Sequence, residues 1–332
     1  MTGMDNKGCT LPGIKRYCAL FVVHSLGRVR QRNRAFFVGR SESALLTCGG
    51  FPKRQLQLSL ERQVTMAALQ QRSNTWRKLR LGDVTASRFG DVLARPAAGG
   101  VFKIEGRRGE YYVAADDGEI LTGCFTAKAD ANKRRAELVA EWQKTHWSES
   151  AESYLNEKLA ELIHCVPGDV WRSDATDWGT AQEPNAFEAA VPAIQTLFRQ
   201  ELSLPVDEYA YIAHPTEPHI GCSPDGIVGD EGLLELKCPY NGAKWIRAKR
   251  YGLTIPKENI PQVQGQLWCA RKKWCAFGYF DPRVAASGLD PLLMIRVERD
   301  NEYIDNALAP RITAFRDYLY TEYDKLVERG PF

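Results

Sequence analysis

The chain has 332 residues, 44% of them hydrophobic and 26% charged, which is the composition of an ordinary globular protein. Its longest apolar run, near residues 18–23, is too short to cross a bilayer, so no membrane association is expected. The nine cysteines include no CxxC pair, which argues against a disulfide framework, a zinc ribbon or a cysteine-ligated cluster. Reduced thiols in the cytoplasm are the expectation, with Cys222 and Cys238 interpreted as small core residues.

The formal net charge of +3 is unevenly distributed. Residues 1–54 contain ten Lys and Arg against two acidic residues, so they contribute +8 and leave −5 for the rest of the chain. Any phosphate-binding groove must therefore be a local arrangement, because global basicity does not favour DNA binding. The basic arm has three open interpretations: a disordered tail that contacts nucleic acid, a transit-like segment, or a stretch that precedes a true start at Met66.

In chain order, residues 83–93 predict a loop that enters a short helix, with Thr85 or Ser87 as its cap. Residues 96–149 predict a small inserted unit, because turn-forming pairs separate three short apolar runs and a helical pattern follows. The three runs are expected to be strands at 101–104, 111–113 and 120–121.

A longer helix is predicted over residues 179–199, where Pro184 is acceptable only in the first turn. This places Glu183 at the very start of that helix, where the helix dipole stabilises a carboxylate. Helices are also predicted over 261–273 and from Ile304 to Leu319. The expected strands lie at 210–214, 226–228, 233–238, 276–280 and 292–297. Helices interleaved with a mixed sheet predict one α/β core.

Residues 225–237, DGIVGDEGLLELK, predict a two-stranded hairpin that carries charged groups. The central GDEG is a turn signal, rich in residues that tolerate positive φ. Because residues alternate between the faces of a strand, Glu235 and Lys237 point to one side and the neighbouring leucines point into the core. Asp225, at the near end of the preceding strand, can then lie beside Glu235.

Two adjacent carboxylates repel each other unless a cation neutralises them, and hard oxygen ligands favour Mg²⁺ or Mn²⁺ over Zn²⁺. A metal there would activate a water and stabilise charge on a phosphate, with Lys237 holding that water as the nucleophile. The pattern therefore favours phosphodiester hydrolysis. The alternative is a surface hairpin whose Glu and Lys are merely solvated.

Other polar residues have more than one interpretation. Glu183 is either a structural carboxylate or the third acid that a two-metal site needs. Gln262 and Gln266 share a helix face at i,i+4, whereas Gln264 points elsewhere. These amides either touch phosphate oxygens or are simply solvated.

The hairpin resembles the active-site hairpin of the phage lambda exonuclease, or YqaJ-like viral recombinase, family within the PD-(D/E)XK nuclease superfamily. The resemblance lies in CSPDG at 222–226 and LELKCP at 234–239. Further similar blocks, in the same order, are WRKLRLG at 76–82, VTAS at 84–87, WG at 178–179 with Glu183, QVQ at 262–264 with Trp268, YFDPR at 279–283 and ERD at 298–300. The likeness covers roughly residues 58–325.

This resemblance implies an α/β fold with a PD-(D/E)XK restriction-endonuclease-like core, in which a mixed central sheet is flanked by helices. The expected organisation is a basic, weakly ordered extension at 1–57 followed by a nuclease domain at 58–332. The inserted hairpin and helix unit at about 96–149 is a departure from the compact family core.

The resemblance also implies residue roles. The first Mg²⁺ would be held by the carboxylates of Asp225 and Glu235 and by the backbone carbonyl of Leu236. A second Mg²⁺ would be bound by Glu183. Mn²⁺ is expected to substitute. Lys237 would position the attacking water, and Gln264 would contact the scissile region. A pocket for the DNA 5′-phosphate would be formed by Arg80, Ser87 and Ser223.

The function expected from the resemblance is Mg²⁺-dependent 5′→3′ exonuclease action on double-stranded DNA ends, leaving 3′ overhangs for recombination. The implied partners are a single-strand annealing protein and two further copies in a homotrimeric ring, in the cytoplasm of a bacterium or a phage-infected cell. The alternatives are an endonuclease of the same fold that nicks or resolves DNA, and a catalytically silent DNA-end-binding protein. The intact acidic and lysine positions argue against the silent protein.

Overall fold

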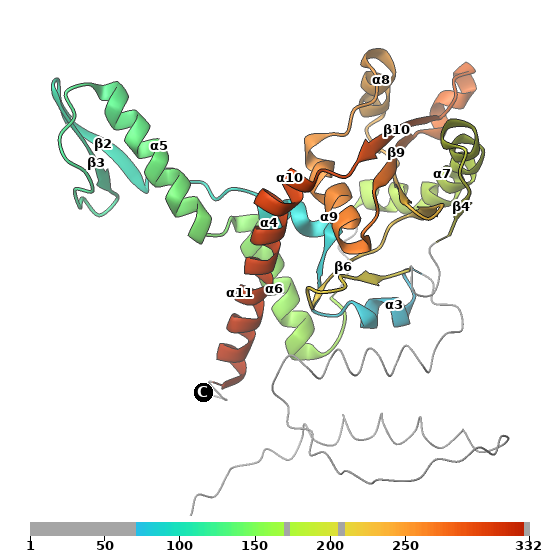
Figure 1. The fold of residues 1–332 in the computed structure, drawn as a ribbon, viewed down its shortest axis with the longest axis horizontal. Coiled ribbons are helices and arrows are strands. Elements are labelled where there is room, and N and C mark those ends of the chain that lie inside the picture. The colour runs from blue at the N-terminus through green and yellow to red at the C-terminus, as the bar shows by residue number, and fades with distance from the viewer. Residues whose placement is uncertain (1–70, 169–172, 205–209, 329–332) are drawn as a thin grey trace, which may run out of the picture. The chain divides into compact units, whose positions relative to one another are not determined.

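The computed structural model describes residues 71–168, 173–204 and 210–328, and Figure 1 labels most of their helices and some of their strands. The predicted N-terminal extension at 1–57 and the alternative start at Met66 lie outside the described residues.

A mixed five-stranded sheet with the order β10-β9-β8-β7-β4 is the centre of the fold (Figure 1). Its strands are β4 (Leu202–Ser203), β7 (Gly226–Val228), β8 (Gly232–Lys237), β9 (Trp274–Phe280) and β10 (Leu292–Glu298). β8 and β9 run parallel, and the other neighbouring pairs are antiparallel. The four strands predicted between residues 226 and 297 are confirmed, with ends that differ by at most two residues.

Helices cover both faces of this sheet, because successive side chains of β8 point to opposite faces and apolar side chains are buried on each. One face packs against α7 (Asp174–Phe198), with Leu234 and Leu236 among the buried residues of that layer. The other face packs against α8 (Gly242–Tyr251) and α9 (Ile260–Ala270), with Leu233 and Phe277 buried there. The mixed α/β class predicted from the sequence is confirmed.

A second, three-stranded sheet has the order β1-β6-β5, with β1 parallel to β6. Its strands are β1 (Val84–Thr85), β5 (Ile212–Ala213) and β6 (Ile220–Cys222). A separate apolar cluster joins β6 to α9 and to α4 (Phe89–Leu93), α6 (Glu149–His164) and α11 (Ala309–Glu328). The remaining elements of this part are α3 (Asn74–Leu79), η2 (Ala86–Arg88), η4 (Lys257–Asn259), η5 (Pro282–Ser287), α10 (Asn301–Tyr303) and η6 (Ile304–Leu308).

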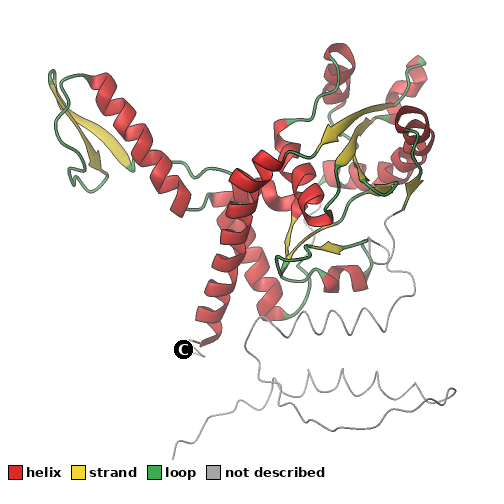
Figure 2. Cartoon of the chain, in the orientation of Figure 1, coloured by secondary structure: helices red, strands yellow, loops and turns green. Residues whose placement is uncertain are grey.

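Residues between α4 and α6 form a hairpin packed on a helix, β2 (Phe102–Arg107), β3 (Glu110–Ala115) and α5 (Lys128–Thr145), as Figure 2 shows. The predicted third strand at 120–121 is reduced to an isolated bridge between Ala114 and Ile120. Arg311 of α11 holds the end of this segment, because it donates to the Lys144 carbonyl at 2.7 Å and lies 3.6 Å from the Trp147 ring centre. The division of the chain into domains stays a prediction.

The predicted start of the long helix is wrong. α7 begins at Asp174, where the Ser173 side chain accepts the Thr176 N–H at 3.2 Å, and Pro184 and Pro192 both lie inside the helix. Proline removes one backbone donor, and burial of the helix against the sheet outweighs that local cost. Glu183 therefore lies in the third turn, away from the positive end of the helix dipole.

The described cysteines are all free thiols. Burial, reinforced by the negative charges of Asp225 and Glu183, raises the pKa of Cys238 to about 12, so its thiol is protonated at neutral pH. This protonation agrees with the interpretation of Cys238 as a packing residue. No helix in the described ranges combines the length and the apolar character needed to cross a membrane.

A substitution at Gly265 on α9 would test the close packing of this helix against α4. A Cβ added there would lie 2.4 Å from the Phe89 ring, which is completely buried and has no room to swing away. Gly265→Ala is therefore expected to destabilise the protein by about 1–2 kcal/mol, because overpacking outweighs the gain in helix propensity. Thermal unfolding measures this effect as a lower Tm.

The matched control is Gly179→Ala on α7, where a new Cβ would meet nothing within 4 Å. This change should leave Tm unchanged or raise it, since alanine is favoured by up to about 1 kcal/mol in a helix. Equal Tm values for the two variants would contradict the tight contact between α9 and α4.

Candidate active site

The hairpin formed by β7 and β8 positions two carboxylates next to each other. Gly226 pairs with Leu234 in an antiparallel register, and Asp225 and Glu235 are the residues next to this pair on the two strands. Two hydrogen bonds fix this end of the hairpin: the Asp225 N–H donates to the Leu234 carbonyl at 3.0 Å, and the Leu236 N–H donates to Asp225 Oδ2 at 2.7 Å. The charge of Glu235 also acts on the carboxyl group of Asp225, so the two acids are neighbours.

Glu235 is the buried centre of a polar network, with only 2% of its surface exposed. Its Oε1 accepts from Lys237 Nζ and from Gln262 Nε2, both at 2.6 Å. Its Oε2 accepts from Gln266 Nε2 at 2.7 Å, and Lys237 Nζ also donates to Gln262 Oε1 at 2.9 Å. The ammonium of Lys237 is therefore held beside the two carboxylates by groups from β8 and α9.

The electrostatics of the site are those of crowded buried charges. Burial, followed by the negative charge of Glu235, raises the pKa of Asp225 well above its usual value, and Glu183 adds to this. Burial lowers the pKa of Lys237, but the charges of Glu235 and Asp225 outweigh it, so the net pKa is raised and the ammonium persists at neutral pH. Asp225 would thus be stabilised as a carboxylate by additional positive charge.

Glu183 reaches the site from α7, on the other side of the sheet. It lines the same cavity of about 150 Å³ as Asp225, and its carboxylate is paired with Arg72. The three predicted acids are therefore brought to one region. Asp225 and Glu235 both belong to the hairpin, whereas Glu183 comes from a helix.

The residues predicted to hold a 5′-phosphate line this same cavity, namely Arg80, Ser87 and Ser223. The Arg80 guanidinium lies 4.2 Å from the Trp76 ring centre and donates to Thr85 Oγ1 at 3.2 Å. Trp76 Nε1 in turn donates to Ser223 Oγ at 3.1 Å. Trp76 and Thr85 were not predicted as parts of the cavity wall, although the i,i+4 spacing of Trp76 and Arg80 on α3 signals their contact.

The structure does not bring Gln264 to the site. Its Nε2 donates to the Glu298 carbonyl at 2.9 Å, and its Oε1 accepts from the Asp300 N–H at 2.9 Å, so both ends of the amide hold the start of α10. The helix turns Gln262 and Gln266 toward Glu235 instead. Their shared face was visible in the sequence, but which face of α9 meets the strand depends on tertiary packing.

Arg283 lies beside the site and contacts the segments that carry its residues. It donates to the carbonyls of Pro239 and Tyr240 at 3.1 Å, and its Nε donates to Asp281 at 2.7 Å. Its guanidinium lies 4.5 Å from the ring centre of Trp178 on α7. Arg283 thus connects the loop after β8, the strand that carries Lys237, with α7, the helix that carries Glu183.

The donor set can be tested against the predicted metal. Among the residues that the structure describes, no three His, Cys, Asp or Glu side chains gather closely enough to hold an ion. Glu183 is paired with Arg72, and Glu235 accepts from three donors. Asp225 and Glu235 still present hard carboxylate oxygens together, and the Gln266 Oε1 is buried on the same network with no hydrogen-bond partner. These oxygen donors fit Mg²⁺ or Mn²⁺.

Comparison with known proteins places this geometry in context. Residues 136–273 match the family model of the YqaJ-like viral recombinase domain. The chain is similar to the crystal structure of an alkaline exonuclease, LHK-Exo, from Laribacter hongkongensis, at 24% identity over 78% of this chain and 98% of that chain, with a TM-score of 0.54. The structure of LHK-Exo in complex with dAMP gives 25% identity, the same coverage and a TM-score of 0.54. No curated protein matches. The predicted fold is that of these alkaline exonucleases.

Proposed function

We infer from the YqaJ-like viral recombinase family, to which residues 136–273 belong, that this chain is a DNA exonuclease that uses divalent metal ions. It would degrade one strand of a duplex from the 5′ end and leave 3′ overhangs for recombination. The observation that carries the proposal is the buried Glu235, which neighbours Asp225 and is bonded to Lys237 at 2.6 Å, beside a cavity lined by Asp225 and Arg80.

The chain's own residues divide the proposed chemistry among them. Asp225 and Glu235, with the backbone carbonyl of Leu236, would hold the first ion, and Glu183 would hold the second after releasing Arg72. The bound cations would supply Lewis-acid stabilisation of the charge that builds up on the phosphate. Lys237, fixed by Glu235 and Gln262, would orient the attacking water by donating to its oxygen.

The DNA end would be bound in the adjoining cavity. The planar guanidinium of Arg80, stacked on Trp76, suits the oxygens of a terminal phosphate, and the hydroxyls of Ser87 and Ser223 offer further donors. Because Asp225 and Glu183 line the same cavity, a phosphate held by Arg80 would place the next phosphodiester near the acids.

Linear and covalently closed circular duplexes test the reaction class. With Mg²⁺, the protein is expected to release nucleotides from a blunt linear duplex that carries 5′-phosphates and to leave the closed circle intact. A duplex labelled at one 5′ end should lose that label first. Nicking or digestion of the circle would reject the exonuclease in favour of an endonuclease of the same fold.

Arg80→Ala should abolish the preference for phosphorylated 5′ ends. A charge-assisted pair with a phosphate is stabilising by about 1.5–3 kcal/mol, so the rate on phosphorylated ends should fall by roughly 10- to 100-fold, while hydroxyl ends are little affected. Initial rates on both kinds of end measure this. Arg77→Ala, on the same helix and outside the cavity, is the control, and equal rates on the two ends in the unaltered protein would reject the role of Arg80.

The homotrimer and the annealing partner are further parts of this proposal. Light scattering in the presence and absence of blunt duplex tests the first of them. A trimer would have three times the chain mass of 37.4 kDa. A monomer under both conditions would exclude the ring.

A further inference from the structure

Helix α8 follows the strand that carries Lys237 and is unusually basic for this part of the chain. It contains Lys244, Arg247, Lys249 and Arg250 and no acidic residue, whereas residues 55–332 together carry a net charge of −5. We propose that α8 is the docking surface for the sugar-phosphate backbone of the duplex being digested. This inference rests on the proposed nuclease function and names where the double-stranded part of the substrate lies.

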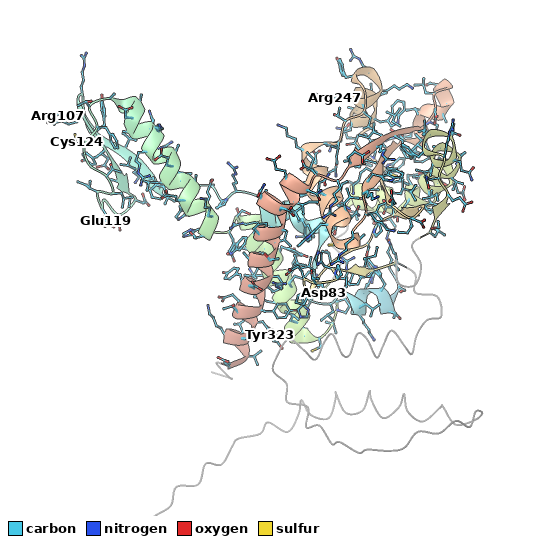
Figure 3. All side chains as sticks on the ribbon, in the orientation of Figure 1. Asp83, Arg107, Glu119, Cys124, Arg247 and Tyr323 are labelled. Atoms are coloured by element: carbon cyan, nitrogen blue, oxygen red, sulfur yellow. The ribbon has the colours of Figure 1, made fainter. Side chains whose placement is uncertain are left out.

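The packing of α8 leaves its cations facing outward. Trp245 and Ala248 are its buried residues and attach it to the sheet, and the other side chains of the helix are exposed. Figure 3 labels Arg247 on this helix, at the margin of the fold. No acidic side chain within the described ranges pairs with Arg247, Lys249 or Arg250, so their charge is free to meet an external anion.

Two cavities that share Ser87 relate the site to the surroundings of α8. Ser87 lines both the cavity of about 150 Å³ that contains Arg80 and a second cavity of about 520 Å³ that contains Gln262, Lys257 and Glu258. Lys244 of α8 contacts Glu258 at 3.4 Å. The larger cavity is therefore lined both by Gln262, which bonds Glu235, and by Glu258, which contacts the first turn of α8.

The chemistry of α8 fits a duplex. A helix of ten residues is about 15 Å long, which matches roughly four base pairs of B-DNA at 3.4 Å each. Tyr251, 71% exposed, and Ile246, 44% exposed, add apolar contact surface beside the cations. Cations that contact phosphates release counterions, so binding through α8 should depend strongly on salt.

The test removes three charges from α8 and three from another helix. One variant carries Arg247→Gln, Lys249→Gln and Arg250→Gln. Its control carries Lys128→Gln, Lys133→Gln and Lys144→Gln, three exposed lysines of α5. Affinity for a blunt 30-base-pair duplex is measured against salt concentration with Mg²⁺, in a Glu235→Gln background that prevents digestion, and kcat and KM are measured without that background.

The α8 variant should lower the slope of log affinity against log salt by about 2–3 and raise KM by about tenfold or more, with kcat unchanged. The α5 control should change neither. An unchanged slope and KM in the α8 variant, or an equal loss in the control, would overturn the inference. Failure of the unaltered protein to digest linear DNA would instead reject the proposed function, so the two failures are distinguishable.

Discussion

Glu235→Gln is expected to abolish the Mg²⁺-dependent release of nucleotides from linear duplex DNA. The substitution removes one of the two neighbouring carboxylates of the hairpin, and with it the negative charge that would hold the cation. It also places an amide against three donors, from Lys237, Gln262 and Gln266. Loss of metal stabilisation at the phosphate predicts a fall in rate on the order of 10³ or more.

The measurement is the initial rate of acid-soluble nucleotide release, with thermal unfolding as the check that the variant is folded. Glu231→Gln is the matched control, because Glu231 lies in the turn of the same hairpin, is exposed, and pairs with Lys273 on the surface. This control should keep full activity. Persistent Mg²⁺-dependent hydrolysis in Glu235→Gln, or in Glu235→Ala, would contradict the assigned role.

Lys237→Met should eliminate cleavage while preserving DNA binding. Methionine keeps much of the aliphatic stem but removes the ammonium that bonds Glu235 at 2.6 Å and Gln262 at 2.9 Å. A group that orients the attacking water acts mainly on the chemical step, so kcat should fall by about 10²–10⁴-fold. The affinity for duplex should stay within about threefold, because one buried charge is a small part of a phosphate-binding surface.

Single-turnover rates and fluorescence anisotropy separate the two effects. Lys273→Met, an exposed lysine paired with the hairpin turn, is expected to behave as the unaltered protein in both measurements. A Lys237→Met protein that cleaves DNA at an undiminished rate would remove this residue from the mechanism. Lost affinity with an unchanged kcat would make Lys237 a DNA-binding residue instead.

The hairpin could be predicted from the sequence because several local signals agree there. The GDEG turn, the alternation in LLELK and the acid before the first strand all indicate the same hairpin, and Gly226 pairs with Leu234 with the two acids beside this pair. The central strands were predictable for the same reason. β4 and β6, with two and three residues, are too short to carry a periodic pattern.

Two features were not predictable from local rules: where α7 begins, and which glutamines of α9 lie at the site. Pro184 indicates a helix start, yet burial of Ala186, Ala190 and Ile194 on the sheet sustains the helix through it. The neighbouring glutamines of α9 differ only in which face meets β8, and that depends on packing between elements distant in the sequence. Helix α8 was missed because Trp245 and Ala248 are its only buried residues, which leaves almost no apolar stripe.

Anomalous diffraction from crystals soaked in Mn²⁺, at a concentration that supports DNA digestion, tests the central claim most directly. We expect an anomalous peak in contact with the carboxylates of Asp225 and Glu235, absent from crystals of the Glu235→Gln protein. A peak that contacts neither residue, or no peak while the dissolved protein digests DNA under the same conditions, would contradict it.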